Sequence, residues 1–100
     1  MTRHLTVAVL ILVLSGCVGR PPREEYTLAN TALQSARAAQ AARFAPGFFT
    51  KAEQSYRQAQ HEFEDREYSK ANEDFQKARK FAEQAENYTV LKKAETGEAN

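Results

Sequence analysis

The residues able to do acid–base or metal chemistry are few. His61 lies between Gln60 and Glu62, and the carboxylates of Glu64 and Asp65 follow within one turn. Catalysis by two carboxyl groups needs one raised and one ordinary pKa inside a cleft, which a solvated turn does not provide. The sequence after residue 17 holds neither a Cys–His pairing nor a His/Cys cluster with metal-ligand spacing. We therefore expect no enzyme, no metal site and no small-molecule substrate.

Cys17 is the one cysteine, and the residues before it point to a chemical role for its sulfur. Arg3 and His4 form a short basic start, and an apolar run from Leu5 to Leu14 follows, interrupted only by Thr6. This order is typical of a secretory signal peptide. Ten helical residues cover about 15 Å, whereas the hydrocarbon core of a bilayer is about 30 Å thick. We therefore expect residues 1–16 to be a cleaved signal peptide and not a membrane span.

The residues Leu14, Ser15, Gly16 and Cys17 resemble the lipobox of bacterial lipoproteins. The resemblance implies that signal peptidase II recognises Leu14, Ser15 and Gly16 and cuts before Cys17. It also implies a diacylglyceryl group on the Cys17 sulfur and an N-acyl chain, such as palmitate, on its amine. Two or three such chains hold a protein on a bilayer almost permanently. The alternative is a structural role for Cys17 as a buried or disulfide-bonded cysteine, but the sequence has no second cysteine to pair with it.

The residue after the cysteine bears on which membrane would hold the lipid. Val18 follows Cys17, and lipoproteins of enteric bacteria without Asp at that position usually reach the outer membrane. The expected location is the bacterial cell envelope, on the outer membrane facing the periplasm, with the inner membrane as the alternative. Residues 17–23 contain Pro21 and Pro22, which favour a short extended tether.

The charge balance of the chain excludes one large class of partners. Lys and Arg number 14 against 13 Asp and Glu, a formal net charge of +1, and the two signs are interspersed. A chain without a basic patch offers no field for a polyanion, so nucleic acid is not expected as a partner.

From Glu24 onward the apolar residues recur at helical spacing. In the first segment Ala29, Ala32, Ala36 and Ala39 step by 3, 4 and 3, which predicts a helix over about 24–44. Pro46 suits the start of a second helix, over about 47–66. The second helix and a third, over about 68–94, alternate aromatic residues with Ala in two coiled-coil-like stripes: Phe48, Ala52, Tyr56, Ala59 and Phe63, then Tyr68, Ala71, Phe75, Ala78, Ala82, Ala85 and Tyr88.

These segments define the expected fold. The sequence predicts an all-α domain over residues 24–95, either an up-down-up three-helix bundle or a helical hairpin whose first helix peels away. Its core is expected to be coiled-coil-like and built from Ala and aromatic side chains. Residues 96–100 are expected to be a frayed tail, because they have little to bury.

Several spacings in this region recur in a known family. They are the Ala-rich first helix, the junction Phe44-Ala45-Pro46, the small–aromatic–small spacing of Ala52, Tyr56 and Ala59, and the pair Tyr68 and Ala71. On these features, residues 32–85 resemble the domain-of-unknown-function family 4398. The resemblance implies an envelope lipoprotein or a secreted protein. Some members carry the helical segment ahead of a peptidoglycan-binding OmpA-like domain.

Two roles are compatible with these features. The first is a structural or adaptor lipoprotein that contacts another envelope protein or itself. Phe48 and Phe49 are adjacent and cannot both face one stripe, and Phe81 lies beside Ala82. We take Phe48, Phe49 and Phe81 as candidate partner contacts; alternatively, these rings cover the first helix within the bundle.

The alternative role is a peptidoglycan-associated binding module. It needs an exposed groove in which polar side chains converge to meet carboxylates and amides of the cell wall. The candidates for such a groove lie on the first helix: Asn30, Arg37, Gln40 and Arg43.

Overall fold

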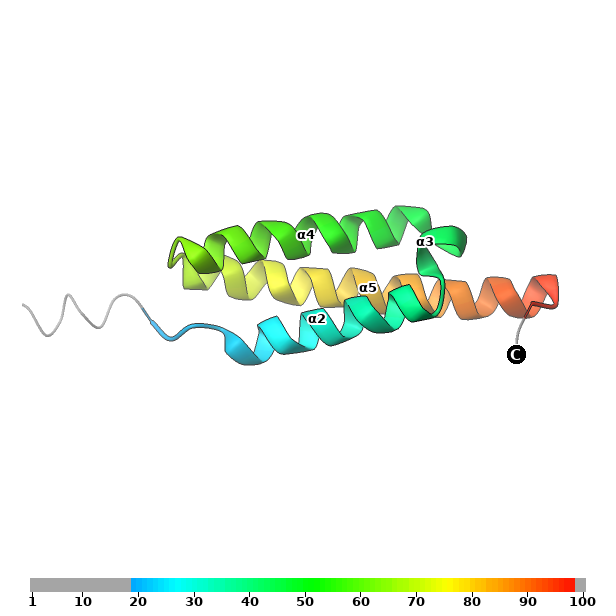
Figure 1. The fold of residues 1–100 in the computed structure, drawn as a ribbon, viewed down its shortest axis with the longest axis horizontal. Helices are drawn as coiled ribbons and strands as arrows, with labels where there is room; N and C mark the ends of the chain where they lie inside the picture. Colours follow the sequence, from blue (N-terminus) through cyan, green and yellow to red (C-terminus); the bar gives the residue numbers. More distant parts are fainter. Residues whose placement is uncertain (1–18, 99–100) are drawn as a thin grey trace, which may run out of the picture.

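The computed structural model describes residues 19–98. Within this range the chain forms four helices and no strand: α2 (Arg23–Ala38), α3 (Ala41–Phe44), α4 (Pro46–Glu64) and α5 (Tyr68–Thr96). α2, α4 and α5 run up, down and up, and the short α3 joins the first two (Figure 1). The predicted all-α bundle is confirmed. The predicted signal peptide and Cys17 lie outside the described residues.

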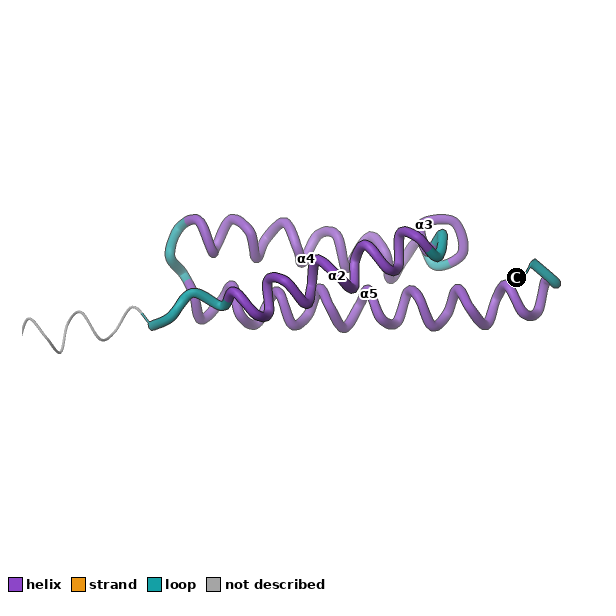
Figure 2. Tube along the Cα trace, turned by 60° about the horizontal axis from the view of Figure 1, so that its bottom comes forward, coloured by secondary structure: helices purple, strands orange, loops and turns teal. Residues whose placement is uncertain are grey.

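α5 is the longest helix, and the other two long helices pack along it (Figure 2). α2 and α4 contact each other much less than either contacts α5. With 29 residues, α5 is about 44 Å long. Its last turns extend past α3 and past the neighbouring ends of α2 and α4 (Figure 1). The bundle therefore has a free helical end, the last turns of α5, opposite the end where α2 begins.

The core consists of Ala side chains and aromatic rings, as the spacing predicts. α5 buries Phe75 and a row of Ala residues at steps of 3 and 4. Small side chains let the helices approach closely, and the rings fill the remaining space. The buried apolar residues form two clusters: Ala29, Ala59, Ala71, Phe75 and Ala78 near the tether, and Leu33, Ala36, Ala41, Ala45, Phe49, Ala52, Ala82 and Ala85 near α3.

The prediction of one helix over 24–44 is wrong, because the chain breaks between α2 and α3. Gln40 has the left-handed conformation with φ 69°. Its N–H donates to the Arg37 carbonyl at 3.0 Å, and its own carbonyl accepts from the Arg43 N–H at 3.0 Å. The turn brings Ala41 and Ala45 into the core, where they are 0% and 3% exposed. This burial offsets the cost of about 1–2 kcal/mol for one left-handed residue.

The turn between α4 and α5 ends α4 at Glu64, two residues before the predicted end. Arg66 has φ 61°. Its N–H donates to the Phe63 carbonyl at 3.2 Å, and the Glu67 N–H donates to the Glu62 carbonyl at 2.8 Å. These two bonds form a Schellman motif, in which glycine usually occupies the left-handed position. Arg66 therefore carries backbone strain that glycine would not.

Arg66→Gly is expected to raise the free energy of unfolding by about 0.5–1 kcal/mol, because it removes this strain from the folded state. The measurement is urea unfolding followed by circular dichroism. Gln54→Gly is the matched control, since it places glycine at an exposed position inside α4 and is expected to lose about 1 kcal/mol. A loss of stability in both variants would contradict the prediction.

The C-terminal end is more ordered than the predicted tail over 96–100. α5 continues through Thr96, and Gly97 ends it in the left-handed conformation with φ 75°. The Glu98 N–H donates to the Lys93 carbonyl at 2.8 Å. The Glu98 Oε1 atom lies 3.4 Å from Arg43 Nη2. The backbone hydrogen bond that caps α5 and this contact to α3 hold residues 96–98 in place, although their side chains bury little surface. Residues 99–100 lie outside the described residues.

Candidate functional site

A polar groove of about 310 Å³ runs between α2 and α4. It exists because both helices pack on α5 more than on each other. Leu33 and Tyr56 supply its apolar lining. The remaining lining residues are polar and come from both helices: Asn30, Gln34 and Arg37 from α2, and Glu53, Arg57 and Gln60 from α4.

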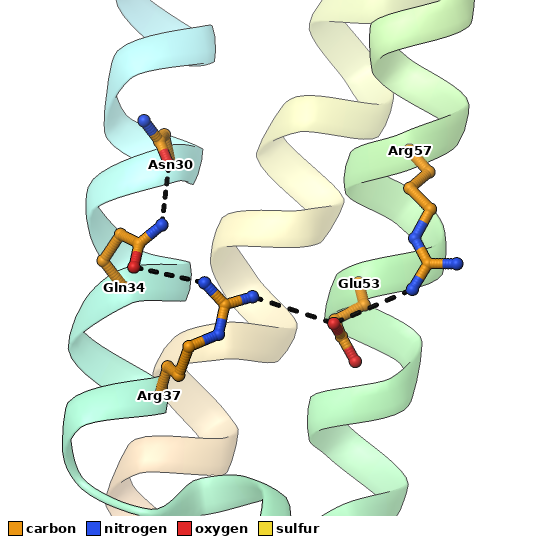
Figure 3. Close-up of polar contacts among 5 residues, drawn as sticks. All are labelled: Asn30, Gln34, Arg37, Glu53 and Arg57. Carbon is orange, nitrogen blue, oxygen red and sulfur yellow. Dashed lines mark hydrogen bonds and ion pairs between the residues drawn. The ribbon is translucent and has the colours of Figure 1, made fainter.

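Five of these side chains form a continuous polar chain across the groove (Figure 3). Gln34 Nε2 donates to Asn30 Oδ1 at 3.5 Å, and Arg37 Nη1 donates to Gln34 Oε1 at 3.1 Å. Glu53 Oε2 then lies 3.7 Å from Arg37 Nη2 and 3.7 Å from Arg57 Nη2.

Two guanidinium groups therefore share one carboxylate. Arg37 and Arg57 are 49% and 69% exposed, so each ion pair contributes little to stability. The same exposure leaves guanidinium N–H groups available to a ligand. Because an arginine fork matches a carboxylate, the groove suits a ligand that carries carboxylate and amide groups.

The structure brings together two of the four residues predicted for such a groove. Asn30 and Arg37 lie in it, whereas Gln40 occupies the break after α2. Arg43 lies on α3, with its guanidinium carbon 4.9 Å from the Phe44 ring centre. The sequence interpretation missed Gln34, Glu53 and Arg57. The signal for the last two was present, since their spacing of four predicts an ion pair, but the spacing does not reveal that Arg37 joins them across the groove.

A second groove, which we call the end groove, lies where α3 and α4 meet α5. It encloses about 380 Å³ and is lined by Phe44, Ala45, Pro46, Gly47, Phe48, Lys51 and Tyr88. The Phe48 and Tyr88 ring centres are 6.2 Å apart. The Lys51 ammonium lies over the neighbouring Phe81 ring, 5.6 Å from its centre. Aromatic rings with a cation at the edge suit an apolar side chain that is accompanied by a carboxylate.

The three predicted contact rings have different positions. Phe49 is 6% exposed and belongs to the core, so it is not available to a partner and its prediction as a contact is wrong. α4 is rotated so that the Phe49 ring faces α5 and the Phe48 ring lies at the edge of the end groove. Phe48 and Phe81 are half-buried and pack on the same core cluster. Phe48 is the ring among the three that lines a groove.

Three of the four exposed large apolar side chains of the described residues lie on α5, near its free end. Val90 is 58% exposed, Leu91 is 64% exposed and Tyr88 is 41% exposed. Leu28 on α2 is the other large apolar residue in this class, at 36%. The sequence analysis predicted the third helix over about 68–94 but did not single out Val90 and Leu91, because helical spacing alone does not show where α5 extends past its neighbours.

One carboxyl group is buried between α4 and α5. Glu62 is 6% exposed, and its Oε1 atom has no hydrogen-bond partner within residues 19–98. Gln58 Nε2 donates to the other oxygen at 3.4 Å. Burial raises the pKa of Glu62, and the nearby Asp74 carboxyl group and the negative charges of Asp74 and Glu67 raise it further. The Gln58 hydrogen bond lowers this pKa but does not outweigh the other causes.

The raised pKa of Glu62 makes stability depend on pH. Between the ordinary value of 4.5 and the raised value, the folded chain binds this proton more tightly than the unfolded chain. The stabilisation is therefore fully present below pH 4.5 and is lost as the pH rises through the folded-state pKa. Glu62→Gln is expected to remove this slope and to raise the free energy of unfolding at pH 7.5 by about 1 kcal/mol.

The measurement for Glu62→Gln is urea unfolding between pH 4 and pH 8, with each variant compared with the unmodified chain. Glu64→Gln is the control, because Glu64 is exposed on the same helix. An unchanged pH slope in Glu62→Gln would show that Glu62 does not set the pH dependence.

Two further structural findings concern the described part of the chain. None of its helices is both long enough and apolar enough to cross a bilayer. Between residues 19 and 98, no three His, Cys, Asp or Glu side chains are grouped so that they could hold a metal ion.

Comparison with known proteins places the helical bundle in a family. No curated protein and no solved structure matches the chain. A family model described as a domain of unknown function matches residues 24–100, which include α3, α4, α5 and all but the first residue of α2. This match extends the resemblance noted for residues 32–85 over the whole helical region. The chain therefore belongs to the domain-of-unknown-function family DUF4398.

Proposed function

We propose that this protein is a lipid-anchored structural or adaptor protein of the bacterial cell envelope. The lipid would be attached covalently to Cys17, and we propose no cofactor for the protein. Residues 17–23 would connect the lipid to α2. The proposed location is the outer membrane, facing the periplasm, because Val18 and not Asp follows the cysteine. The proposed role is binding to a protein, without catalysis.

The observation that carries this proposal is the free end of α5. Val90 and Leu91 are adjacent near this end and are 58% and 64% exposed, and contiguous apolar surface on a small domain marks an interaction site. α2 begins at one end of the bundle, and the free end of α5 lies at the other (Figure 1). A lipid at Cys17 would therefore leave the free end able to project away from the bilayer and meet another protein.

In-cell crosslinking of the full chain tests the proposal. A photoreactive residue in place of Leu91 is expected to capture one defined envelope protein or a second copy of the chain. The same residue in place of Gln76, which is exposed on the same helix but distant from the free end, is the control and is expected to capture neither. Capture of lipid alone at Leu91, or the same products at both positions, would contradict an adaptor role.

The polar groove favours a second candidate function, a peptidoglycan-associated binding module. Its two guanidinium groups around Glu53 suit the carboxylates of wall peptides. The test is co-sedimentation of the full chain with purified peptidoglycan at low salt. The double variant Arg37→Gln, Arg57→Gln is expected to lose this binding, whereas Lys70→Gln is expected to keep it. Failure of the unmodified chain to co-sediment would eliminate this candidate.

A further inference from the structure

Gly47 keeps the end groove open. It is the second residue of α4, and it does not have the positive φ that would require glycine. A Cβ atom at this position would meet no atom within 4 Å. Glycine in a helix is less favourable than alanine, so neither the backbone nor the packing of this chain explains it. The missing side chain leaves space beside Phe48 and Lys51 for a group from outside.

A complementary surface lies on α5 itself, and we call it the outer strip. Its members are all exposed: Glu83, Asn87, Val90 and Leu91. Steps of 4, 3 and 1 place them on the side of α5 opposite its buried row of Ala82, Ala85 and Thr89. The outer strip thus combines the two properties that suit the end groove, an apolar knob at Leu91 and a carboxylate at Glu83.

The charges of the two surfaces are available for such a contact. Lys51 and Glu83 form no ion pair with any other residue between 19 and 98. Both side chains are exposed. Leu91 lies one turn beyond Tyr88, which lines the end groove, so the knob and the groove are neighbours on one helix.

The two surfaces also agree in spacing along α5. In the end groove Phe48 lies beside Tyr88, and Lys51 lies over Phe81. The apolar part of the groove and its cation are therefore at levels about 10 Å apart along α5. In the outer strip Leu91 and Glu83 are about 12 Å apart, in the same order along the helix. When two α5 helices run parallel, Leu91 of one copy can therefore reach the end groove of the other while Glu83 reaches its Lys51.

We infer that the occupant of the end groove is a second copy of this chain. Leu91 of each copy fills the groove of the other, and Glu83 pairs with Lys51 of the partner subunit. Because groove and knob lie side by side, a two-fold axis along the bundle makes the contact reciprocal and closes it at two copies. An anionic lipid headgroup would pair with Lys51 but would leave the outer strip without a partner.

The small size of the contact favours its formation between copies that are anchored in the same membrane. Stable interfaces between soluble proteins bury about 1,200–2,000 Å² in total, more than one groove and one knob provide. Anchoring both copies in one membrane makes them parallel and raises their effective concentration, so a weak contact becomes populated. In this respect the inference rests on the proposed lipid anchor. It also identifies the partner in the proposed adaptor role as a second copy of the chain.

Zero-length carbodiimide crosslinking of the full lipidated chain in liposomes tests this inference. The reagent joins an amine to a carboxylate that lies in contact with it. A mixture of ¹⁴N- and ¹⁵N-labelled chains distinguishes crosslinks between copies from crosslinks within one copy. The expected product is a mixed-isotope peptide that joins Lys51 to Glu83. Absence of any such peptide between copies would overturn the inferred pairing.

Charge reversal tests the same pair with an independent readout. Carbodiimide reacts with the Lys51 amine and the Glu83 carboxylate, which these variants replace. The dimer yield is therefore measured here with an apolar photoreactive residue in place of Leu91. Lys51→Glu and Glu83→Lys are each expected to lower this yield about tenfold, because each places like charges together. The double variant is expected to restore the dimer.

Two controls accompany these variants. Circular dichroism of each one confirms that the bundle is folded, and Lys70→Glu, at the other end of α5, is expected to leave the dimer unchanged. Absence of dimer in the chain with native charges, or no rescue in the double variant, overturns self-pairing. If the residue at position 91 then captures a different protein in cells, self-pairing fails but the adaptor function stands. If it captures no protein, both fail.

Discussion

Phe75→Ala is expected to lower the free energy of unfolding by about 3–5 kcal/mol. Phe75 is 0% exposed, and it and Thr89 are the largest fully buried side chains of the described residues. Its ring centre lies 4.4 Å from that of Tyr26 and 5.8 Å from that of Tyr56. The other buried members of this cluster are Ala residues, which have no rotamers with which to fill the space that the ring would leave. A large cavity would therefore remain.

The loss is large relative to the stability of such a domain. Small domains are typically stable by about 5–15 kcal/mol, so Phe75→Ala is expected to leave a sizeable unfolded fraction at about 37 °C. Urea unfolding followed by circular dichroism measures the effect on the full chain. Phe48→Ala is the matched control: its ring is half-buried at the edge of the end groove, and the expected loss is below about 1.5 kcal/mol. Equal losses in the two variants would show that Phe75 is not the main packing residue.

The success of the sequence prediction at α5 has a physical reason. α5 packs against two helices along most of its length, so its buried row must repeat at helical spacing. Ala71, Phe75 and Ala78 could therefore be assigned to the core from their steps alone. The spacing of Ala29 and Ala36 on α2 is informative for the same reason.

The errors occur where the chain changes direction. No sequence signal marks the break at Gln40, because glutamine is an ordinary helix former and the left-handed turn is stabilised by burial of Ala41 and Ala45. The same turn sets the rotation of α4, which decides that Phe49 and not Phe48 is buried. Adjacent rings cannot be assigned to inside and outside until that rotation is known.

The polar groove could be predicted only in part. The spacing of Glu53 and Arg57 within α4 is visible in the sequence and matches their ion pair. The contact of Arg37 with Glu53 joins two helices, so it depends on the relative rotation and height of α2 and α4. Periodicity within one helix carries no information on how two helices are rotated or shifted along the bundle axis relative to each other. The end groove and its match to the outer strip were missed for the same reason.

Cys17→Ser is expected to abolish lipid attachment completely. A serine hydroxyl lacks the nucleophilic sulfur that accepts the diacylglyceryl group. The resemblance of Leu14 to Cys17 to a lipobox then implies that cleavage before residue 17 is lost as well. Labelling with a palmitate analogue, together with intact-mass measurement, checks both: the variant is expected to carry no label and to retain residues 1–16. Val18→Ala is the control and is expected to remain lipidated.

The same substitution separates the anchor from the contact surface. Each buried methylene group contributes about 0.8 kcal/mol, so two or three acyl chains make dissociation from the bilayer negligible. Residues 19–98 are unchanged in Cys17→Ser, so circular dichroism is expected to show the same helical bundle. Because a small contact at the free end of α5 depends on concentration in the membrane, crosslinking at Leu91 is nevertheless expected to fall sharply. Persistence of the label, or of full crosslinking without the lipid, would contradict the proposed anchor or its role in the contact.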